Sequence, residues 1–295
     1  MKNGKLKGVL LLISSAFFFG IMSIFIRLLR GGGLPPMSQL FLRYIFAFIC
    51  AFIYIFFIQR TKIKIAKKDV FLILITTVFG YALTNLVITY SVLYTQISNF
   101  LFLFYSYAII APILGFIFLK DKINKINVFS LVLSFVALFL LFQPNSVSTW
   151  KLGGVLSILS AIGQAGYLIL RKKLKQYPAN IMMLVNTLTG ILVLSILSLI
   201  FENNFYFKGG IMHITAKTWF TTILSGLDNF LAWFTMTKGF EYFKATSGSL
   251  ILLSELLFGI FFAFIFFGEI PAFSALLGGV LILISTAFVI LKGES

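Results

Sequence analysis

Long apolar runs, separated by short polar gaps, dominate this chain of 295 residues. A bilayer core about 30 Å thick needs roughly 20 apolar residues in a helix that rises 1.5 Å per residue. Segments of about that length predict membrane-spanning helices at 6–29, 38–58, 70–92, 96–119, 126–143, 152–170, 180–201, 217–238, 245–267 and 272–291. The pattern therefore predicts an all-α membrane protein with ten transmembrane helices.

Basic residues fall mainly in every second gap between these segments. The rich gaps hold Lys2, Lys5 and Lys7; Arg60, Lys62, Lys64, Lys67 and Lys68; Lys120, Lys122 and Lys125; Arg171, Lys172, Lys173 and Lys175; Lys238 and Lys244; and Lys292. The other gaps hold few, namely Arg27, Arg30, Lys151, Lys208 and Lys217. Because cytoplasmic loops retain Lys and Arg, we expect a multi-pass protein of the cell (cytoplasmic) membrane with both termini in the cytoplasm.

The composition also limits the partners and cofactors that we expect. A formal charge of +16 would suggest a nucleic-acid partner in a soluble chain, but juxtamembrane clusters set orientation and attract lipid headgroups instead, so we expect no nucleic-acid partner. Cys50 and His213 are the only residues of their kinds. Gly-rich phosphate loops and nucleophile motifs are absent. The sequence predicts no cofactor and no metal site.

The two halves of the chain resemble each other at a shift of about 145 to 149 residues. Leu83-Thr84-Asn85-Leu86 matches Leu227-Asp228-Asn229-Phe230, and Phe116–Asp121 matches Phe264–Glu269. We therefore predict two repeats of five helices, 1–145 and 146–295. Since five is odd, the second repeat enters the membrane in the inverted orientation, an arrangement that permits alternating access around a shared midplane site.

With these repeats, the chain resembles the EamA-type transporters of the drug/metabolite transporter superfamily over essentially its whole length. The matching residues are Ala245–Leu250 at the start of the ninth helix, Glu255 within it, Phe267-Gly268-Glu269 at its end, and Leu42-Arg43-Tyr44 in the second helix. The prolines of the family pattern are absent at Ala108 and Leu256. The resemblance implies export of amino acids, their derivatives or similar compounds more often than uptake.

Two acidic residues lie deep inside predicted spans. Asp228 is about 11 residues into the eighth helix and Glu255 about 10 residues into the ninth, so both reach roughly the midplane. An ionisable group in hydrocarbon costs at least about 2.5 to 3.5 kcal/mol and needs a reason. We expect both acids to line a substrate path, and one or both of them to take up a proton or bind a cationic amine of the substrate. The alternative is a protonated acid that only hydrogen-bonds between helices.

Further polar and aromatic residues are candidates for the cavity wall. They are Asn85, Asn229, Gln164, Tyr105, Tyr107 and Trp233. We expect Arg43 to snorkel to the membrane interface or to pair with a carbonyl or helix end. Asp121 and Glu269 fit helix N-termini, and the spacing of Ser274 and Gly278 indicates close helix packing and is compatible with a homodimer.

The sequence thus predicts a secondary active transporter of a small polar or amphipathic metabolite, coupled to protons or to substrate exchange, and no enzyme. Two other classes stay open. An intramembrane enzyme would use the two acids for general acid/base chemistry, although the predicted spans hold no aspartyl dyad and no histidine. A channel or a non-transporting membrane scaffold would need a pore or a partner surface.

Overall fold

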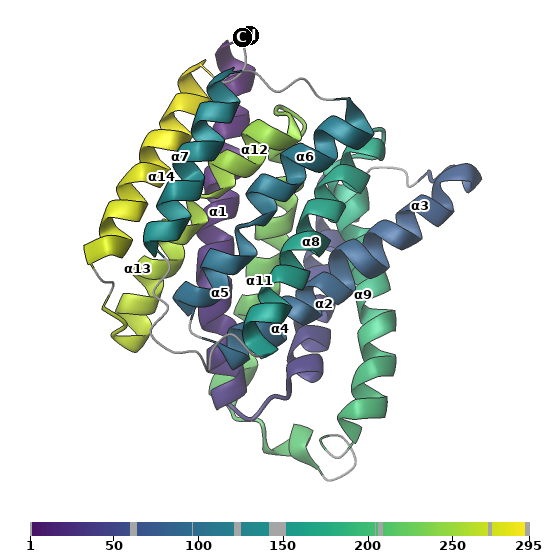
Figure 1. Cartoon of the computed structure of the whole chain (residues 1–295). Helices are drawn as coiled ribbons and strands as arrows, with labels where there is room; N and C mark the ends of the chain where they lie inside the picture. Colours follow the sequence, from purple (N-terminus) through teal and green to yellow (C-terminus); the bar gives the residue numbers. More distant parts are fainter. Residues whose placement is uncertain are drawn as a thin grey trace.

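The computed structural model is a bundle of helices, drawn in Figure 1, and describes residues 2–59, 64–95, 97–120, 125–141, 152–203, 205, 209–270 and 273–292. The first half comprises α1 (Lys2–Gly31), α2 (Pro36–Ile53), η1 (Tyr54–Gln59), η2 (Lys67–Asp69), α3 (Val70–Ile75), η3 (Thr76–Leu83), α4 (Thr84–Tyr94), α5 (Ile97–Phe104), α6 (Tyr107–Leu119) and α7 (Lys125–Leu141). The second half comprises α8 (Leu152–Lys173), α9 (Ala179–Phe201), η5 (Gly210–His213), α11 (Ala216–Gly239), α12 (Ala245–Leu252), α13 (Glu255–Phe267) and α14 (Phe273–Lys292).

When segments that continue one another are joined, the described residues form 10 helices besides the short 3₁₀ helix η5, as the apolar pattern predicts. Within the described residues, 6 helices are long and apolar enough to cross a membrane: Gly4–Gly31, Pro36–Ile58, Lys67–Tyr94, Leu152–Lys173, Ala179–Phe201 and Ser247–Phe267. Shorter apolar helices are Tyr107–Leu119, Val128–Ala137 and Leu277–Phe288. The 24-residue α11 is in neither group, and it carries Ser225, Asp228 and Asn229 in the interior of the bundle.

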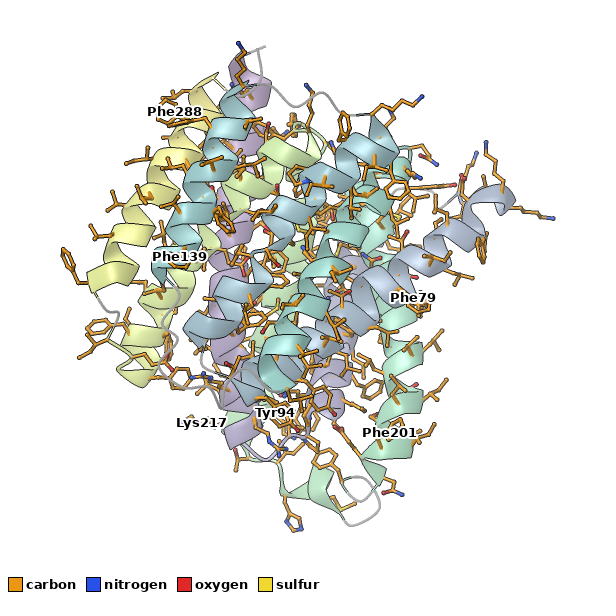
Figure 2. The ribbon with its side chains drawn as sticks, viewed as in Figure 1. Phe79, Tyr94, Phe139, Phe201, Lys217 and Phe288 are labelled. Atoms are coloured by element: carbon orange, nitrogen blue, oxygen red, sulfur yellow. The ribbon has the colours of Figure 1, made fainter. Side chains whose placement is uncertain are left out.

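The outer surface of the bundle is apolar. Phe79, Phe139 and Phe201 are between 63% and 67% exposed, and Figure 2 shows them projecting from the outside of their helices. Side chains of this kind suit a hydrocarbon surrounding, where an exposed phenyl ring is solvated as well as a buried one. Polar side chains such as Asn85, Gln164 and Asn229 are buried instead.

Many of the contacts between helices recur when the two halves are exchanged. Helix α1 packs against α11, α12 and α13, and its counterpart α8 packs against α4, α5 and α6. Two counterpart pairs pack directly on each other, α2 on α9 and α7 on α14. In the latter pair, the hydroxyls of Ser134 and Ser285 lie 2.8 Å apart. The sequence repeat is therefore also a repeat in three dimensions.

One helix of each half is interrupted at equivalent residues. Helices α5 and α6 meet at Tyr105-Ser106, and α12 and α13 meet at Leu253-Ser254, an offset of about 148 residues. At both breaks the serine hydroxyl donates to the carbonyl three residues earlier, Leu103 at 2.7 Å and Ile251 at 2.8 Å. The breaks form without the prolines of the family pattern because tight turns of the 3₁₀ type satisfy the backbone locally.

Candidate functional site

A cavity lies in the interior between the two helix breaks. The residues that flank the breaks, Phe104 and Tyr107 on one side and Leu252 and Glu255 on the other, all line it. Its volume for the centre of a water-sized sphere is about 20 Å³, which is room for about one water molecule. The structure therefore shows this cavity nearly closed.

Five of the eight residues that the sequence suggests for the site line this cavity: Asn85, Tyr107, Gln164, Trp233 and Glu255. Asn85 comes from α4, Gln164 from α8, Trp233 from α11 and Glu255 from the first turn of α13. Tyr105 lies next to the cavity, and its hydroxyl is close enough to the Glu255 carboxyl to interact with it. The site thus draws on both repeats.

Asp228 lies beside the cavity rather than in its lining. It is 5% exposed, and the charged groups that act on it are Arg43 and Glu255. Arg43 is 1% exposed and donates to the Thr89 hydroxyl over 3.5 Å. The expectation that Arg43 snorkels to the interface is therefore wrong, since a buried acid and a hydroxyl on neighbouring helices face its guanidinium inside the bundle.

Asn229 and Trp233 connect the cavity wall to a group of aromatic rings. The Tyr81 hydroxyl donates to Asn229 Oδ1 over 2.8 Å. The Trp233 ring meets Phe19, Tyr81 and Tyr167 edge to face, with ring centroids 5.5, 4.6 and 4.8 Å apart. These contacts surround the Trp233 ring and favour this one orientation at the cavity.

A wide vestibule of about 540 Å³ opens at the terminal end of the bundle, which we define as the end where α1 begins and α14 finishes. Tyr167 and Met236 line the vestibule, and each also contacts a cavity residue. Tyr167 packs on Trp233, and Met236 Sδ accepts a hydrogen bond from Gln164 over 3.6 Å. The barrier between vestibule and cavity is therefore about one side chain thick.

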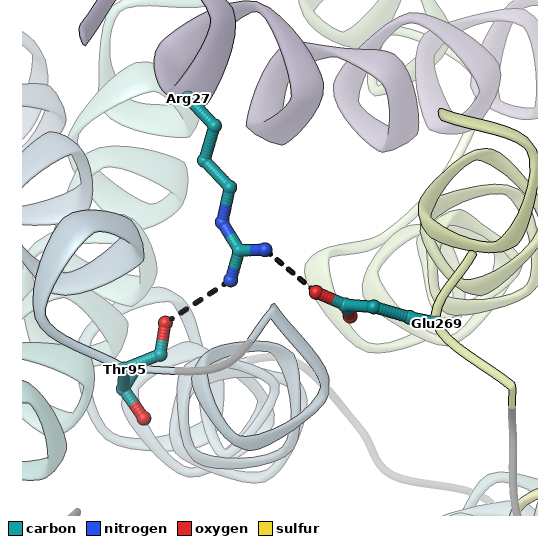
Figure 3. A network of polar contacts seen from close by, with 3 residues as sticks. All are labelled: Arg27, Thr95 and Glu269. Atoms are coloured by element: carbon teal, nitrogen blue, oxygen red, sulfur yellow. Dashed lines mark hydrogen bonds and ion pairs between the residues drawn. The ribbon is translucent and has the colours of Figure 1, made fainter. Parts of the chain in front are cut away.

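The opposite, far end is closed by polar contacts between the repeats. Arg27 of α1 forms an ion pair with Glu269 at 2.6 Å and donates to the Thr95 carbonyl at 3.3 Å, as Figure 3 shows. Nearby, Glu202 accepts from the backbone N–H groups of Met37 and Ser38 over 2.8 and 2.7 Å. Glu269 thus pairs with Arg27, a partner that the helix-terminus interpretation did not include, while Asp121 lies outside the described residues.

Sequence reasoning gave Arg27 no role beyond its charge. A signal was present, since Arg27 and Lys172 occupy equivalent positions at an offset of about 145 residues. Lys172 donates to the carbonyls of Phe240 and Phe243, and Phe243 is the repeat equivalent of Thr95. The two cations therefore bind equivalent connections at opposite ends of the bundle.

Comparison with known proteins defines the class. The model of the EamA-like transporter family matches residues 6–143 and 151–291. The chain belongs to the EamA-like transporter family of the drug/metabolite transporter superfamily and carries two EamA domains.

Individual relatives are more distant. An uncharacterized transporter of Acidianus ambivalens, named for the sor 3′ region, is 26% identical over 180 residues, or 61% of this chain and 68% of that protein. An uncharacterized transporter of Clostridium kluyveri is 21% identical over 200 residues, or 65% of this chain and 64% of that protein. One solved crystal structure matches 98% of this chain and 99% of its own with a TM-score of 0.76 at 11% identity, which shows a shared fold.

Proposed function

We propose that this EamA transporter is a secondary active carrier that exports a small polar or amphipathic metabolite, such as an amino acid or a derivative, by alternating access. The observation that carries the proposal is the nearly closed cavity, with buried Glu255 in its wall, between two repeat-related helix breaks. Interrupted helices at a central site are how carriers with internal repeats bind substrate and coupling ions.

The proposal includes inverted repeats with both termini in the cytoplasm. Five helices in each half, the exchange of contacts between the halves and the basic clusters at one set of connections support it. With this orientation the vestibule faces the cytoplasm, and Arg27 and Glu269 close the outer side. The structure then corresponds to the state in which an exporter takes up its substrate.

Energy coupling is proposed to use protons. Glu255 and Asp228 are the buried acids at the cavity and beside it. In a dry interior, a carboxyl group that binds a proton or a cation in one state and releases it in the other can couple the two fluxes. A carrier of this kind needs no nucleotide.

The test is flux in liposomes that contain the purified protein. Labelled amino acids, amines and nucleosides are offered with and without a pH gradient. The proposal expects saturable flux of at least one compound, driven by the gradient and weakened in Glu255→Gln. It fails on coupling if the double variant Asp228→Asn, Glu255→Gln keeps its full dependence on the pH gradient. Non-saturable flux would instead indicate a channel.

A further inference from the structure

Three side chains in the cavity lining offer acceptor oxygens to a ligand. Gln164 directs its amide nitrogen to Met236, and its oxygen Oε1 is buried without a hydrogen-bond partner among the described residues. Asn85 donates from Nδ2 to the Tyr81 carbonyl over 2.9 Å, which leaves its amide oxygen as the acceptor. Glu255 adds a carboxylate. Three side chains from α4, α8 and α13 thus present oxygens.

The described lining contains no basic side chain to meet a negative charge. Trp233 Nε1 is a donor that is buried without a partner in the described structure, and the hydroxyls of Ser23 and Tyr107 in the lining can donate or accept. Arg43, the nearest candidate for an anion, does not line the cavity and faces Thr89 and Asp228. A carboxylate placed here would meet the carboxylate of Glu255 with no cation beside it, which is strongly unfavourable in a dry interior.

The remaining wall is largely aromatic. Phe19, Phe100, Phe104, Tyr107 and Trp233 line the cavity together with aliphatic residues. The ring faces carry negative charge density that attracts cations, and the rings offer an apolar surface for a flat hydrocarbon body.

We propose that the cavity selects compounds with a primary ammonium group and an aromatic body, and rejects α-amino acids and carboxylates with the same body. The ammonium group has three N–H donors, which match the oxygens of Glu255, Gln164 and Asn85. This inference rests on the proposed carrier function; of the compounds named there it keeps the amine derivatives and excludes the amino acids themselves.

Binding requires the cavity to widen beyond its present volume. The lining residues that would move are those that flank the helix breaks, namely Phe104, Tyr107, Leu252 and Glu255. Rearrangement at such breaks costs few regular backbone hydrogen bonds, since the turns already replace them.

The experiment compares four compounds that share a phenyl body. They are 2-phenylethylamine, its N,N,N-trimethyl derivative, phenylalanine and 3-phenylpropionate. Affinity for the full chain in detergent is measured by calorimetry, and flux is measured in liposomes. We expect 2-phenylethylamine to bind at least about ten-fold more tightly than each of the others, because only it brings three N–H donors without a negative charge.

Three variants locate the site. Glu255→Gln and Gln164→Leu are each expected to weaken 2-phenylethylamine binding about ten-fold. The control Asp69→Asn also removes an acid, but at the terminal end, where Asp69 accepts a hydrogen bond from Tyr177 over 2.7 Å. It keeps an accepting oxygen and is expected to bind the amine like the original protein. Unchanged melting curves show that each variant is folded.

The outcomes separate the two proposals. Saturable, gradient-driven flux of phenylalanine or phenylpropionate, without preference for the amine, overturns the ammonium inference and leaves the carrier function standing. Equal binding of the trimethyl derivative overturns recognition by the three oxygens. Tight amine binding that survives both cavity substitutions overturns the site. Absence of saturable flux for every compound tested overturns the carrier function itself.

Discussion

At the scale of single residues, Arg27 makes the contacts that close the far end. Its guanidinium pairs with Glu269, donates to the Thr95 carbonyl and lies 5.4 Å from the centre of the Phe267 ring. These partners come from the α4–α5 connection and from the end of α13, on both sides of the repeat boundary. The side chains of Arg27 and Glu269 are 22% and 35% exposed, so screening limits the ion pair to about 0.5–1 kcal/mol.

Replacing Arg27 by Gln is expected to open the far end more often. A loss of about 0.5–1 kcal/mol shifts the closed-to-open ratio roughly two- to five-fold. The readout is the labelling rate of Ser23→Cys, a cavity position, by a membrane-impermeant maleimide in a Cys50→Ser background. Lys217→Gln removes another far-end cation, one that is exposed (Figure 2), and serves as the control. Equal labelling of both variants would exclude Arg27 as a gate residue.

Arg43 and Asp228 are expected to depend on each other for stability. Arg43→Met removes the buried cation that acts electrostatically on the Asp228 carboxyl and should lower the free energy of unfolding by about 1–3 kcal/mol. Adding Asp228→Asn removes the stranded charge and should restore part of that loss. The measurement is thermal unfolding in detergent across the double-mutant cycle. Additive effects of the two substitutions would show that the residues are not coupled.

At the scale of helices, close approach depends on glycines. Gly226 of α11 lies against α2, where an added Cβ would collide with Phe46 Cβ and lie 2.9 Å from the Arg43 carbonyl oxygen. Gly166 of α8 has no atom within 4 Å of the same position. The two glycines are in helices of similar polarity but differ in what faces them.

Alanine at these two positions is expected to act in opposite directions. Gly226→Ala should destabilise the protein by about 1–3 kcal/mol, because backbone of α2 must move. Gly166→Ala should be neutral or stabilise by up to about 1 kcal/mol through helix propensity. Melting temperatures in one detergent measure the difference. A Gly226→Ala protein that melts like Gly166→Ala would contradict the close α2–α11 contact.

The helix breaks, rather than the helix ends, place side chains at the cavity. Tyr107 and Glu255 occupy equivalent positions just after the two breaks. Because one repeat has a tyrosine there and the other a glutamate, two nearly symmetric turns form an asymmetric site. The apolar pattern does not predict either break, although Ser106 interrupts one run and Ser254 and Glu255 interrupt the other. At both breaks a serine hydroxyl, of Ser106 or Ser254, bonds to the preceding turn, and residues beside both breaks line the cavity.

At the scale of the whole molecule, the proposed orientation predicts which parts are reachable from outside the cell. Tags at both termini should resist a protease added to intact cells, because the termini lie at the terminal end of the bundle. A tag inserted at Gly209 should be cleaved, because Gly209 lies at the far end. Cell lysis makes all three sites accessible and is the control. Cleavage of a terminal tag in intact cells would reverse the orientation.

The sequence by itself determined the class of this protein. Apolar length, the two matched halves and the EamA-like segments were enough for ten helices and a transporter family, because membrane spans are set by local composition and need no tertiary information. Glu255, Asn85, Gln164 and Trp233 were also accessible as candidates, since buried polar residues in apolar helices need a reason.

Tertiary structure decided the rest. Only the fold separates Glu255, which lines the cavity, from Asp228, which faces Arg43 beside it, and only the fold joins Arg27 to Glu269 across the chain. The physical reason is that depth along a helix follows from residue number, whereas the direction in which a side chain faces and the partner it meets depend on how ten helices pack together.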